Sequence, residues 1–340
     1  MRIATYNVEW FNSLFDDEGQ PLDDTGWSGR HNVTRRDQLS ALGKVFTALN
    51  ADAVMVIEAP DTNRTRDTIK ALERFAALFD LRARKAIIGF ASDTQQEIAL
   101  LYDPDVLSVW HAPQGAQTGK KGLAEAPRFD GIFRIDLDID ASEDLVQFSK
   151  PPLELRVKTA SGFEFQMIGV HLKSKAPHGA RGRDAVMRVS IANRRKQLAQ
   201  AVWLRQRIEA HLAQQTPLIV MGDLNDGPGL DEYENLFGRS SVEIILGHPE
   251  GEVLTDPHAT HALQNRWSQL STSRFYISSK KRYLQVLLDY IMVSNPLMSK
   301  RPQWRIWHPF EDEECFALPE LRDALLIASD HFPVTLDFES

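Results

Sequence analysis

Cysteine is almost absent from this 340-residue chain, in which Cys315 is the only one. A single cysteine excludes an intrachain disulfide and any metal site built from several thiolates. It also favours a reducing compartment. We therefore expect a cytoplasmic protein, while export stays open for a chain whose leader has been removed.

Long hydrophobic runs are missing as well. No apolar stretch approaches the roughly 18 residues that a membrane-spanning helix needs, so the sequence predicts no transmembrane segment. The N-terminus lacks the hydrophobic region of a signal peptide, and its short apolar run is typical of a first strand. The chain contains no repeat of fixed period and no low-complexity tract.

The chain also lacks an excess of positive charge. It has 39 Lys and Arg against 47 Asp and Glu, a net charge of −8. This balance excludes a broadly basic nucleic-acid coat but not a local basic track. With 43% apolar residues the chain can bury a large core. No linker divides it, so we predict one domain over residues 1–340, with surface insertions near 11–37 and 299–323.

Apolar periodicity predicts a mixed α/β protein. Apolar residues three and four apart indicate helices, and short apolar or alternating runs indicate strands. We expect residues 98–101 to pair with 106–110, 153–157 to pair with 163–170, and a basic loop at 274–282. The expected helices are 38–49, 69–79 and 184–213. The expected strands are 2–6, 53–57, 98–101, 106–110, 132–139, 153–157, 163–170, 218–221, 286–293 and 334–338.

One predicted strand is followed directly by polar residues. Four apolar residues at 218–221 are followed by Gly222, Asp223 and Asn225. Side chains two residues apart in a strand lie on the same side of the backbone. An Asp and an Asn so placed suit a hard cation or a water beside a phosphate. An ordinary Asx turn after a strand is equally compatible with this segment alone, and we interpret Asp226 as a turn residue.

Polar residues follow other predicted strands in the same way. Buried polar groups are unfavourable unless they meet a partner, so their recurrence predicts one polar pocket at one edge of a sheet sandwich. These residues are Asn7, Glu58, His171, Asp289, Asp330 and His331.

Taken in order along the chain, the short motifs around these residues resemble those of the endonuclease/exonuclease/phosphatase superfamily. They are most similar to those of its deoxyribonuclease I-like, bacterial nuclease-type members. The resemblance covers residues 3 to 338, with one departure, Ile57 where the family usually has Gln. It implies an α/β (α+β) fold, a four-layer α/β/β/α sandwich of two mixed sheets flanked by helices. The motifs are Thr5-Tyr6-Asn7, Glu58, Gly169 to Lys175, Gly222 to Asn225, Leu288 to Ile291 and Ser329 to Val334.

The resemblance implies a metal-dependent hydrolase of phosphoric esters. Glu58 matches the principal ligand of Mg²⁺ or Mn²⁺ in the family, and Asn7 and Asp330 would complete the surroundings of the metal and the phosphate. A hard cation with few carboxylates and several waters suits phosphate chemistry. In purely structural terms, the same three residues could be caps or turn residues.

The expected catalytic groups are two imidazoles and three partners. His331 would stabilise transition-state charge or transfer a proton, with Asp289 fixing its tautomer. Asp223 and Asn225 would position and activate the attacking water. His171 would donate to a phosphate oxygen or to the leaving group.

Three further cations and one acid complete the expected site. Arg128 lies where related enzymes carry a phosphate-contacting Arg, although it could equally be a solvated loop residue. Lys173 and Lys175 adjoin His171 and are expected to bind the phosphate backbone. Glu97, at the start of a strand, is the candidate acid that orients His171.

Two basic segments favour nucleic acid as the substrate. Residues 173–196 contain eight Lys and Arg and one acid, and 274–282 alternates cations with aromatics. Such segments suit a phosphate backbone with bases to stack on, although Arg-rich helix faces are commonly just solvated. DNA is therefore the expected substrate. The alternative is a lipid headgroup, an inositol phosphate or another small phosphorylated metabolite. No protein partner is predicted.

Overall fold

The computed structural model describes residues 1–92, 94, 96–136, 143–177, 179–227, 238–265, 270–277 and 281–340. Parts of three expected segments lie outside these residues. They are 137–139 of the strand expected at 132–139, Lys280 of the basic segment, and Pro228 and Gly229 after the central strand.

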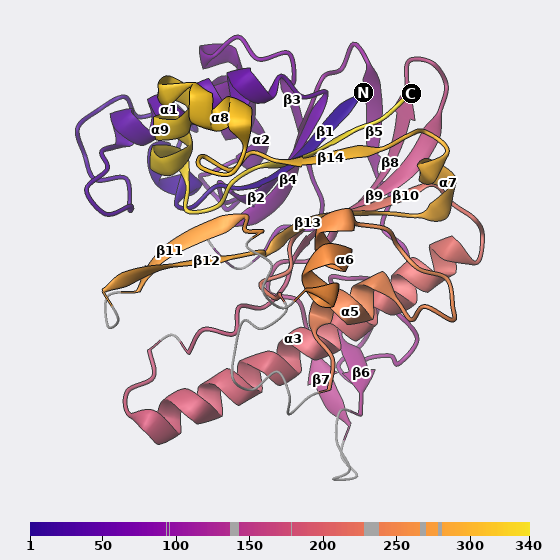
Figure 1. Cartoon of the computed structure of the whole chain (residues 1–340). Coiled ribbons are helices and arrows are strands. Elements are labelled where there is room, and N and C mark those ends of the chain that lie inside the picture. Colours follow the sequence, from indigo (N-terminus) through magenta and orange to yellow (C-terminus); the bar gives the residue numbers. More distant parts are fainter. Residues whose placement is uncertain are drawn as a thin grey trace.

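Two large mixed sheets form the centre of the molecule (Figure 1). The first has the strand order β14-β15-β1-β2-β4-β3, and the second β13-β10-β9-β8-β5. Strands of the first sheet are β1 (Arg2–Asn7), β2 (Ala53–Ala59), β3 (Lys85–Ile88), β4 (Glu97–Tyr102), β14 (Gln303–Ile306) and β15 (Val334–Asp337). Strands of the second are β5 (Leu107–His111), β8 (Leu153–Thr159), β9 (Glu164–His171), β10 (Leu218–Asp223) and β13 (Asp289–Val293).

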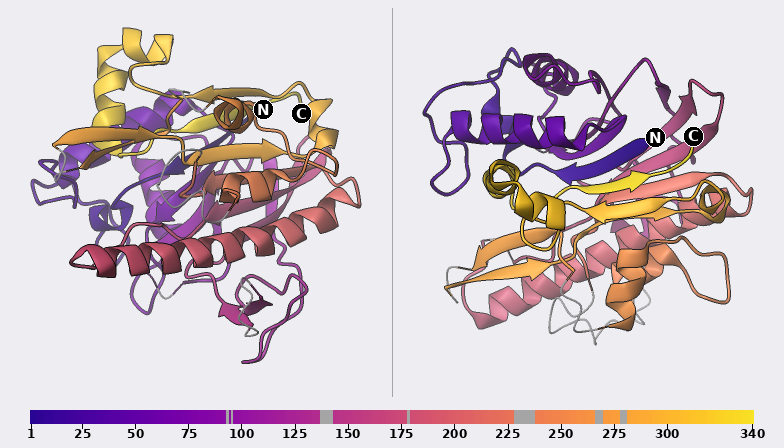
Figure 2. Two further views of the ribbon diagram at one scale, coloured as in Figure 1. Left: turned by 60° about the horizontal axis from the view of Figure 1, so that its bottom comes forward. Right: turned by 45° about the horizontal axis from the view of Figure 1, so that its top comes forward.

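Two small hairpins and a set of helices surround the sheets (Figure 2). The hairpins are β6 (Phe133–Ile135) with β7 (Asp144–Val146), and β11 (Ser273–Ile277) with β12 (Arg282–Val286). Helices on the first sheet are α1 (Arg35–Leu49), α2 (Thr68–Leu78), α8 (Glu313–Ala317) and α9 (Pro319–Ala328), with the short η1 (Phe11–Leu14). Helices on the second are α3 (Arg183–Leu212), α5 (Ser241–Leu246) and α6 (Pro257–Gln264), and α7 (Asn295–Met298) precedes β14.

Side-chain alternation along the strands divides the core into three apolar layers. In β2, Met55 and Ile57 pack between the two sheets, whereas Val54 and Val56 pack against the helices of the first sheet. In β10, Met221 likewise faces the other sheet. Successive strand residues point to opposite faces, so both sheets are covered on both sides. The predicted four-layer α/β/β/α sandwich is confirmed.

The expected pairing of residues 98–101 with 106–110 is wrong. β4 pairs with β2 and β3 in the first sheet, while β5 pairs with β8 in the second. The turn after β4 is bonded to the start of β2, because the backbone N–H of Asp103 donates to the carbonyl of Asp52. The chain therefore crosses between the sheets here. A period of two identifies strands but not their partners.

The C-terminal third also differs from expectation. The basic loop at 274–282 is the hairpin β11–β12 wherever it is described. The strand expected at 286–293 breaks after Val286, because Thr272 Oγ1 accepts hydrogen bonds from the backbone N–H groups of Leu288 and Asp289. β13 consequently starts at Asp289, where that side chain enters the site.

Parts of the two segments that we expected to be surface insertions pack against the rest of the protein. Phe11, Leu14 and Phe15 are buried in the core beneath α1 and α2. Residues 303–306 form an edge strand, and α9 packs on α1. Among the described residues, no helix has both the length and the apolarity needed to cross a membrane.

Candidate active site

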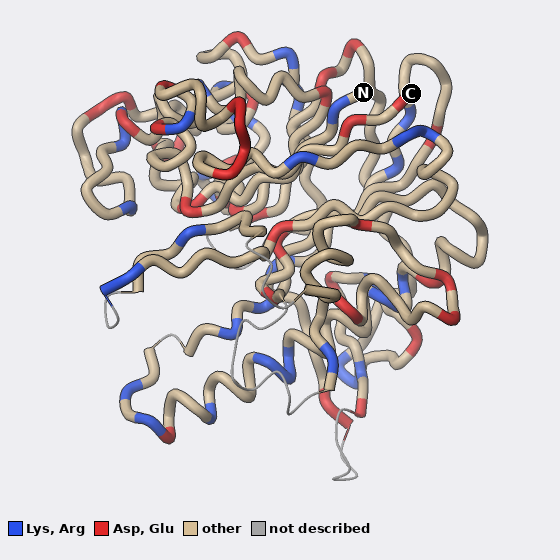
Figure 3. Tube along the Cα trace, viewed as in Figure 1, with Lys and Arg blue, Asp and Glu red and all other residues tan. Residues whose placement is uncertain are grey.

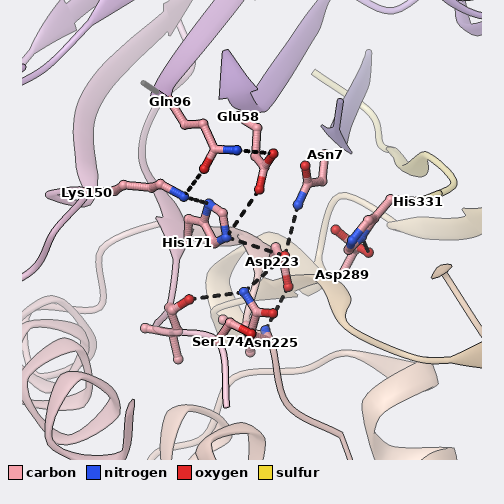
Figure 4. A network of polar contacts seen from close by, with 12 residues as sticks. Asn7, Glu58, Gln96, Lys150, His171, Ser174, Asp223, Asn225, Asp289 and His331 are labelled. Atoms are coloured by element: carbon pink, nitrogen blue, oxygen red, sulfur yellow. Dashed lines mark hydrogen bonds and ion pairs between the residues drawn. The ribbon is translucent and has the colours of Figure 1, made fainter. Parts of the chain in front are cut away.

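The polar strand ends meet in one cavity of about 780 Å³ (Figure 4). β1 runs parallel to β2, and β9 runs parallel to β10, so their carboxyl ends share one edge of the sandwich. Asn7 Nδ2 donates to Asp223 Oδ2 at 2.9 Å and so joins the two sheets at this edge. The predicted residues that line the cavity are Asn7, Glu58, His171, Lys173, Lys175, Asp223, Asn225, Asp330 and His331.

Glu58 sits in a β-bulge with a left-handed backbone, φ 63°. The register of β2 against β4 shifts between Ile57 and Ala59. Such a conformation in a non-glycine residue costs about 1–3 kcal/mol and is typical of functional sites. Burial raises the pKa of Glu58, and Lys150 and His331 oppose that shift. A bound cation would remove much of this burial penalty.

Oxygen atoms of the kind that bind a hard divalent cation line the cavity. Asn7 Oδ1 is buried and has no hydrogen-bond partner among the described residues. The carboxylates of Glu58 and Asp330 line the same cavity. Carboxylate and amide oxygens are the ligands that Mg²⁺ and Mn²⁺ prefer.

A second group of possible ligands lies beside the first. One ligand atom each from Asp223, Asp289 and His331 can be chosen so that all lie within 4.8 Å of one another. Asp289 Oδ1 also has no hydrogen-bond partner in the described part of the chain. His331 Nδ1 is occupied by Asp289, which leaves only its Nε2 for a metal.

His331 and Asp289 form a buried pair. His331 Nδ1 donates to Asp289 Oδ2 at 2.7 Å, and Thr272 Oγ1 donates to the same oxygen at 2.7 Å. Burial alone would lower the pKa of His331, but Asp289, Asp223 and Asp330 hold it well above its usual value. The three carboxylates therefore favour the imidazolium form of the ring.

Asp223 is a buried carboxylate that accepts several hydrogen bonds and has a raised pKa. Its Oδ1 accepts from the backbone N–H of Asn225 at 2.7 Å, and its Oδ2 accepts from the side chains of Asn7 and Asn225. Burial and then the charge of Asp289 raise the pKa of Asp223 to about 7. Asn225 follows in a left-handed turn, φ 49°, which returns its amide toward Asp223.

The sequence matches the model of the Endonuclease/Exonuclease/phosphatase family over residues 4–331. The chain belongs to this family. Like the rest of the family, it is a metal-dependent hydrolase of phosphoric esters. No curated protein sequence matches the chain.

Solved structures that are similar to this chain have low sequence identity to it. TDP2 from Caenorhabditis elegans has a TM-score of 0.50 and 14% identity, covering 100% of this chain and 74% of that one. A mannosyl-6-phosphatase from Bacteroides thetaiotaomicron has a TM-score of 0.47 and 14% identity, with 100% of both chains covered. The human nocturnin catalytic domain with bound sulfate has a TM-score of 0.46 and 15% identity, covering 100% and 94%. At 14% identity, the likeness to TDP2 shows the fold alone.

The partner of His171 is not the residue that the sequence suggested. Glu97 is buried and accepts from the backbone N–H of Ser92, and burial raises its pKa to about 7. Lys150 Nζ lies 3.2 Å from His171 Nδ1 instead, and Gln96 bridges Lys150 to Glu58. Neither Lys150 nor Gln96 was predicted, because both come from segments without periodicity or a family motif.

The structure does not bring Arg128 to the cavity. Its guanidinium forms a bidentate pair with Asp130 at 2.6 Å and stacks over Phe90 at 4.7 Å. Arg128 is absent from the described residues that line the cavity. The preceding Pro127 is held on α3, because its carbonyl accepts from Trp203 Nε1. Family position alone did not reveal this local acidic partner.

Asp226, which we interpreted as a turn residue, is buried and accepts hydrogen bonds from several segments of the chain. Its Oδ1 accepts from Lys175 Nζ at 2.6 Å and lies 3.4 Å from Arg194 Nη1. Its Oδ2 accepts from the backbone N–H of Ser241 at the start of α5. Lys173 and Lys175 both line the cavity, and the charge of Lys175 is paired with Asp226.

Proposed function

We propose that the protein is a nuclease that hydrolyses DNA phosphodiester bonds with Mg²⁺, or with Mn²⁺ in its place. The observation that carries this proposal is a pair of chain segments, here called arms, that bear exposed cations beside the cavity. One arm is the first part of α3, where residues 183–193 are all exposed or half-buried. The other is the hairpin β11–β12. Side chains of both arms line the cavity, Ser190 from α3 and Phe275 from β11 among them.

Both arms carry Lys and Arg (Figure 3), and Asp184 is the one acid among residues 181–193, 273–277 and 281–286, in a chain of net charge −8. Arg181, Arg183 and Arg188 are exposed on or beside α3, and Lys281 and Arg282 are exposed on the hairpin. Cations along a track beside a catalytic site suit a polyanion that extends beyond the bond being cleaved.

Strand alternation divides the aromatic residues of the hairpin between two faces. Phe275 is opposite Leu284, and both line the cavity as an apolar wall. Tyr276 is opposite Tyr283 and is exposed on the other face, where Arg274 stacks on Tyr283 at 3.4 Å. The cavity therefore offers a nucleoside an apolar wall next to the phosphate position.

The proposed roles of the catalytic residues follow from their partners. Asp223, with Asn225, orients the attacking water and accepts its proton. The imidazolium of His331 stabilises the charge that develops on the phosphoryl oxygens, and Asp289 supports it. His171 donates from Nε2 to a phosphate oxygen. These roles place hydrogen-bond donors and a proton acceptor around one phosphorus atom.

Asn7, Glu58 and Asp330 are the proposed ligands of the divalent cation. When bound, the cation would neutralise phosphate charge and polarise the phosphoryl group.

A phosphatase or phosphodiesterase acting on a lipid headgroup, an inositol phosphate or another small phosphorylated metabolite is the second candidate. The volume of the cavity favours it, because about 780 Å³ lies within the usual range of small-ligand sites. The exposed cations of the arms have no evident part in that function.

A substrate panel separates the two candidates. Plasmid DNA, single-stranded oligonucleotides, RNA, sphingomyelin and inositol phosphates are compared at one Mg²⁺ concentration, with an EDTA control. We expect DNA to be hydrolysed fastest, the rate on DNA to fall steeply with salt, and EDTA to abolish it. Faster hydrolysis of inositol phosphates or sphingomyelin, with little salt dependence, would favour the second candidate and overturn the first.

A further inference from the structure

We propose that Lys150 is a positioning residue that keeps the proton of His171 on Nε2, and that Gln96 holds Lys150 in place. The inference rests on the proposed role of His171 as a donor to the phosphate, and it adds two residues to that role. It applies to either substrate class, because both candidates place a phosphate in the same cavity.

The chemistry of the lysine decides the tautomer. Lys150 Nζ lies 3.2 Å from His171 Nδ1. An ammonium group has three N–H donors and no acceptor, so the imidazole nitrogen facing it must accept. His171 Nδ1 then carries a lone pair, and the single proton of the neutral ring is on Nε2.

The opposite side of the ring agrees with this assignment. His171 Nε2 faces two carboxylates, at 3.6 Å from Asp223 Oδ2 and 4.0 Å from Glu58 Oε1. Carboxylate oxygens accept, so a protonated Nε2 matches them. Both distances exceed a normal hydrogen bond, so the Nε2–H group is aimed at this end of the cavity without being committed to either acid.

Gln96 connects the lysine to the opposite wall (Figure 4). Its Oε1 accepts from Lys150 Nζ, while its Nε2 donates to Glu58 Oε2. The amide can satisfy a cation and an anion at once because it has both an acceptor and donors. The chain Glu58–Gln96–Lys150–His171 thereby fixes the direction of the lysine and, through it, the imidazole. Removing such an orienting group elsewhere typically costs about 10- to 100-fold in activity.

Nitrogen NMR of the Mg²⁺-loaded protein tests the tautomer directly. The His171 signals are identified by their loss in His171→Gln. We expect Nε2 to be protonated and Nδ1 to be unprotonated in the wild type, and the two tautomers to exchange in Lys150→Met. A proton on Nδ1 in the wild type, or an unchanged spectrum in Lys150→Met, would overturn the proposal.

Kinetics on bis-p-nitrophenyl phosphate give the second readout. We expect Lys150→Met to lower kcat by about 10- to 100-fold with little change in KM, and Lys150→Arg to restore most of the loss because it keeps an N–H donor. Lys158→Met is the matched control, since Lys158 forms a surface pair with Glu164. Full activity in Lys150→Met, or no rescue by Lys150→Arg, would contradict the positioning role. The NMR result does not depend on the substrate. It therefore distinguishes failure of this proposal from failure of the nuclease proposal.

Discussion

The two histidines of the cavity have partners of opposite charge. Both are buried and line the cavity. Nδ1 of His331 contacts the carboxylate of Asp289, whereas Nδ1 of His171 contacts the amino group of Lys150. Burial and Lys150 hold the pKa of His171 well below its usual value, whereas Asp289, Asp223 and Asp330 together outweigh burial and raise the pKa of His331.

This difference supports the different chemical tasks proposed for the two rings. An imidazole that stays neutral can offer one N–H but cannot supply a positive charge. An imidazolium supported by a carboxylate can do both. Environments that separate the pKa values of two like groups are a general means of dividing acid, base and donor roles within one site. We therefore assign charge stabilisation to His331 and neutral hydrogen bonding to His171.

Removing His331 or Asp223 should have the largest effect. We expect His331→Ala and Asp223→Ala each to lower kcat on bis-p-nitrophenyl phosphate by about 10²- to 10⁴-fold, because each removes a group that acts on the reacting atoms. Circular dichroism and thermal unfolding check that both variants fold. Near-native turnover in either folded variant would mean that the chemistry is misplaced.

Substitution by glutamine should separate the two histidines. We expect His171→Ala to lower kcat by about 10²- to 10³-fold and His171→Gln to recover part of that loss, because glutamine keeps a neutral N–H donor. His331→Gln should recover little relative to His331→Ala, because glutamine carries no charge. Steady-state kinetics of the four variants measure this. Equal recovery at both positions would remove the distinction between the rings.

The cationic arm on α3 should have a smaller effect that depends on salt. Replacing Arg181, Arg183 and Arg188 by Ala should weaken kcat/KM on DNA. The slope of its logarithm against log salt should fall by about one for each phosphate that the variant no longer neutralises. Arg301→Ala is the control, since Arg301 is exposed and paired with Glu339. An unchanged slope would show that the arm is merely solvated.

Much of the site could be predicted because its parts are local in sequence. A short apolar run followed by a polar residue marks each strand end, and parallel pairing brings the ends of β1, β2, β9 and β10 to one edge. Residues such as Asn7 and Asp223, which are 216 positions apart, therefore meet for a reason visible in the pattern.

The rest of the site depends on contacts that no period encodes. Lys150 lies in an aperiodic connection just before β8 and meets His171 at the end of β9, the strand with which β8 pairs. Arg128 has an acidic neighbour two residues away that removes it from the site. The hairpin β11–β12 projects from the body. Its basic composition is typical of a loop, so the sequence did not predict its two strands.

The pH dependence of kcat/KM in wild type and Asp289→Asn tests the assignment of His331 most directly. The pKa of His331 is raised, so its charged form is complete at low pH and is lost as the pH rises through that value. We predict an alkaline limb well above pH 6.5 in the wild type. In Asp289→Asn, which removes the first of the groups that raise this pKa, the limb should move to lower pH. An alkaline limb at the same pH in both proteins would contradict a charged His331 supported by Asp289.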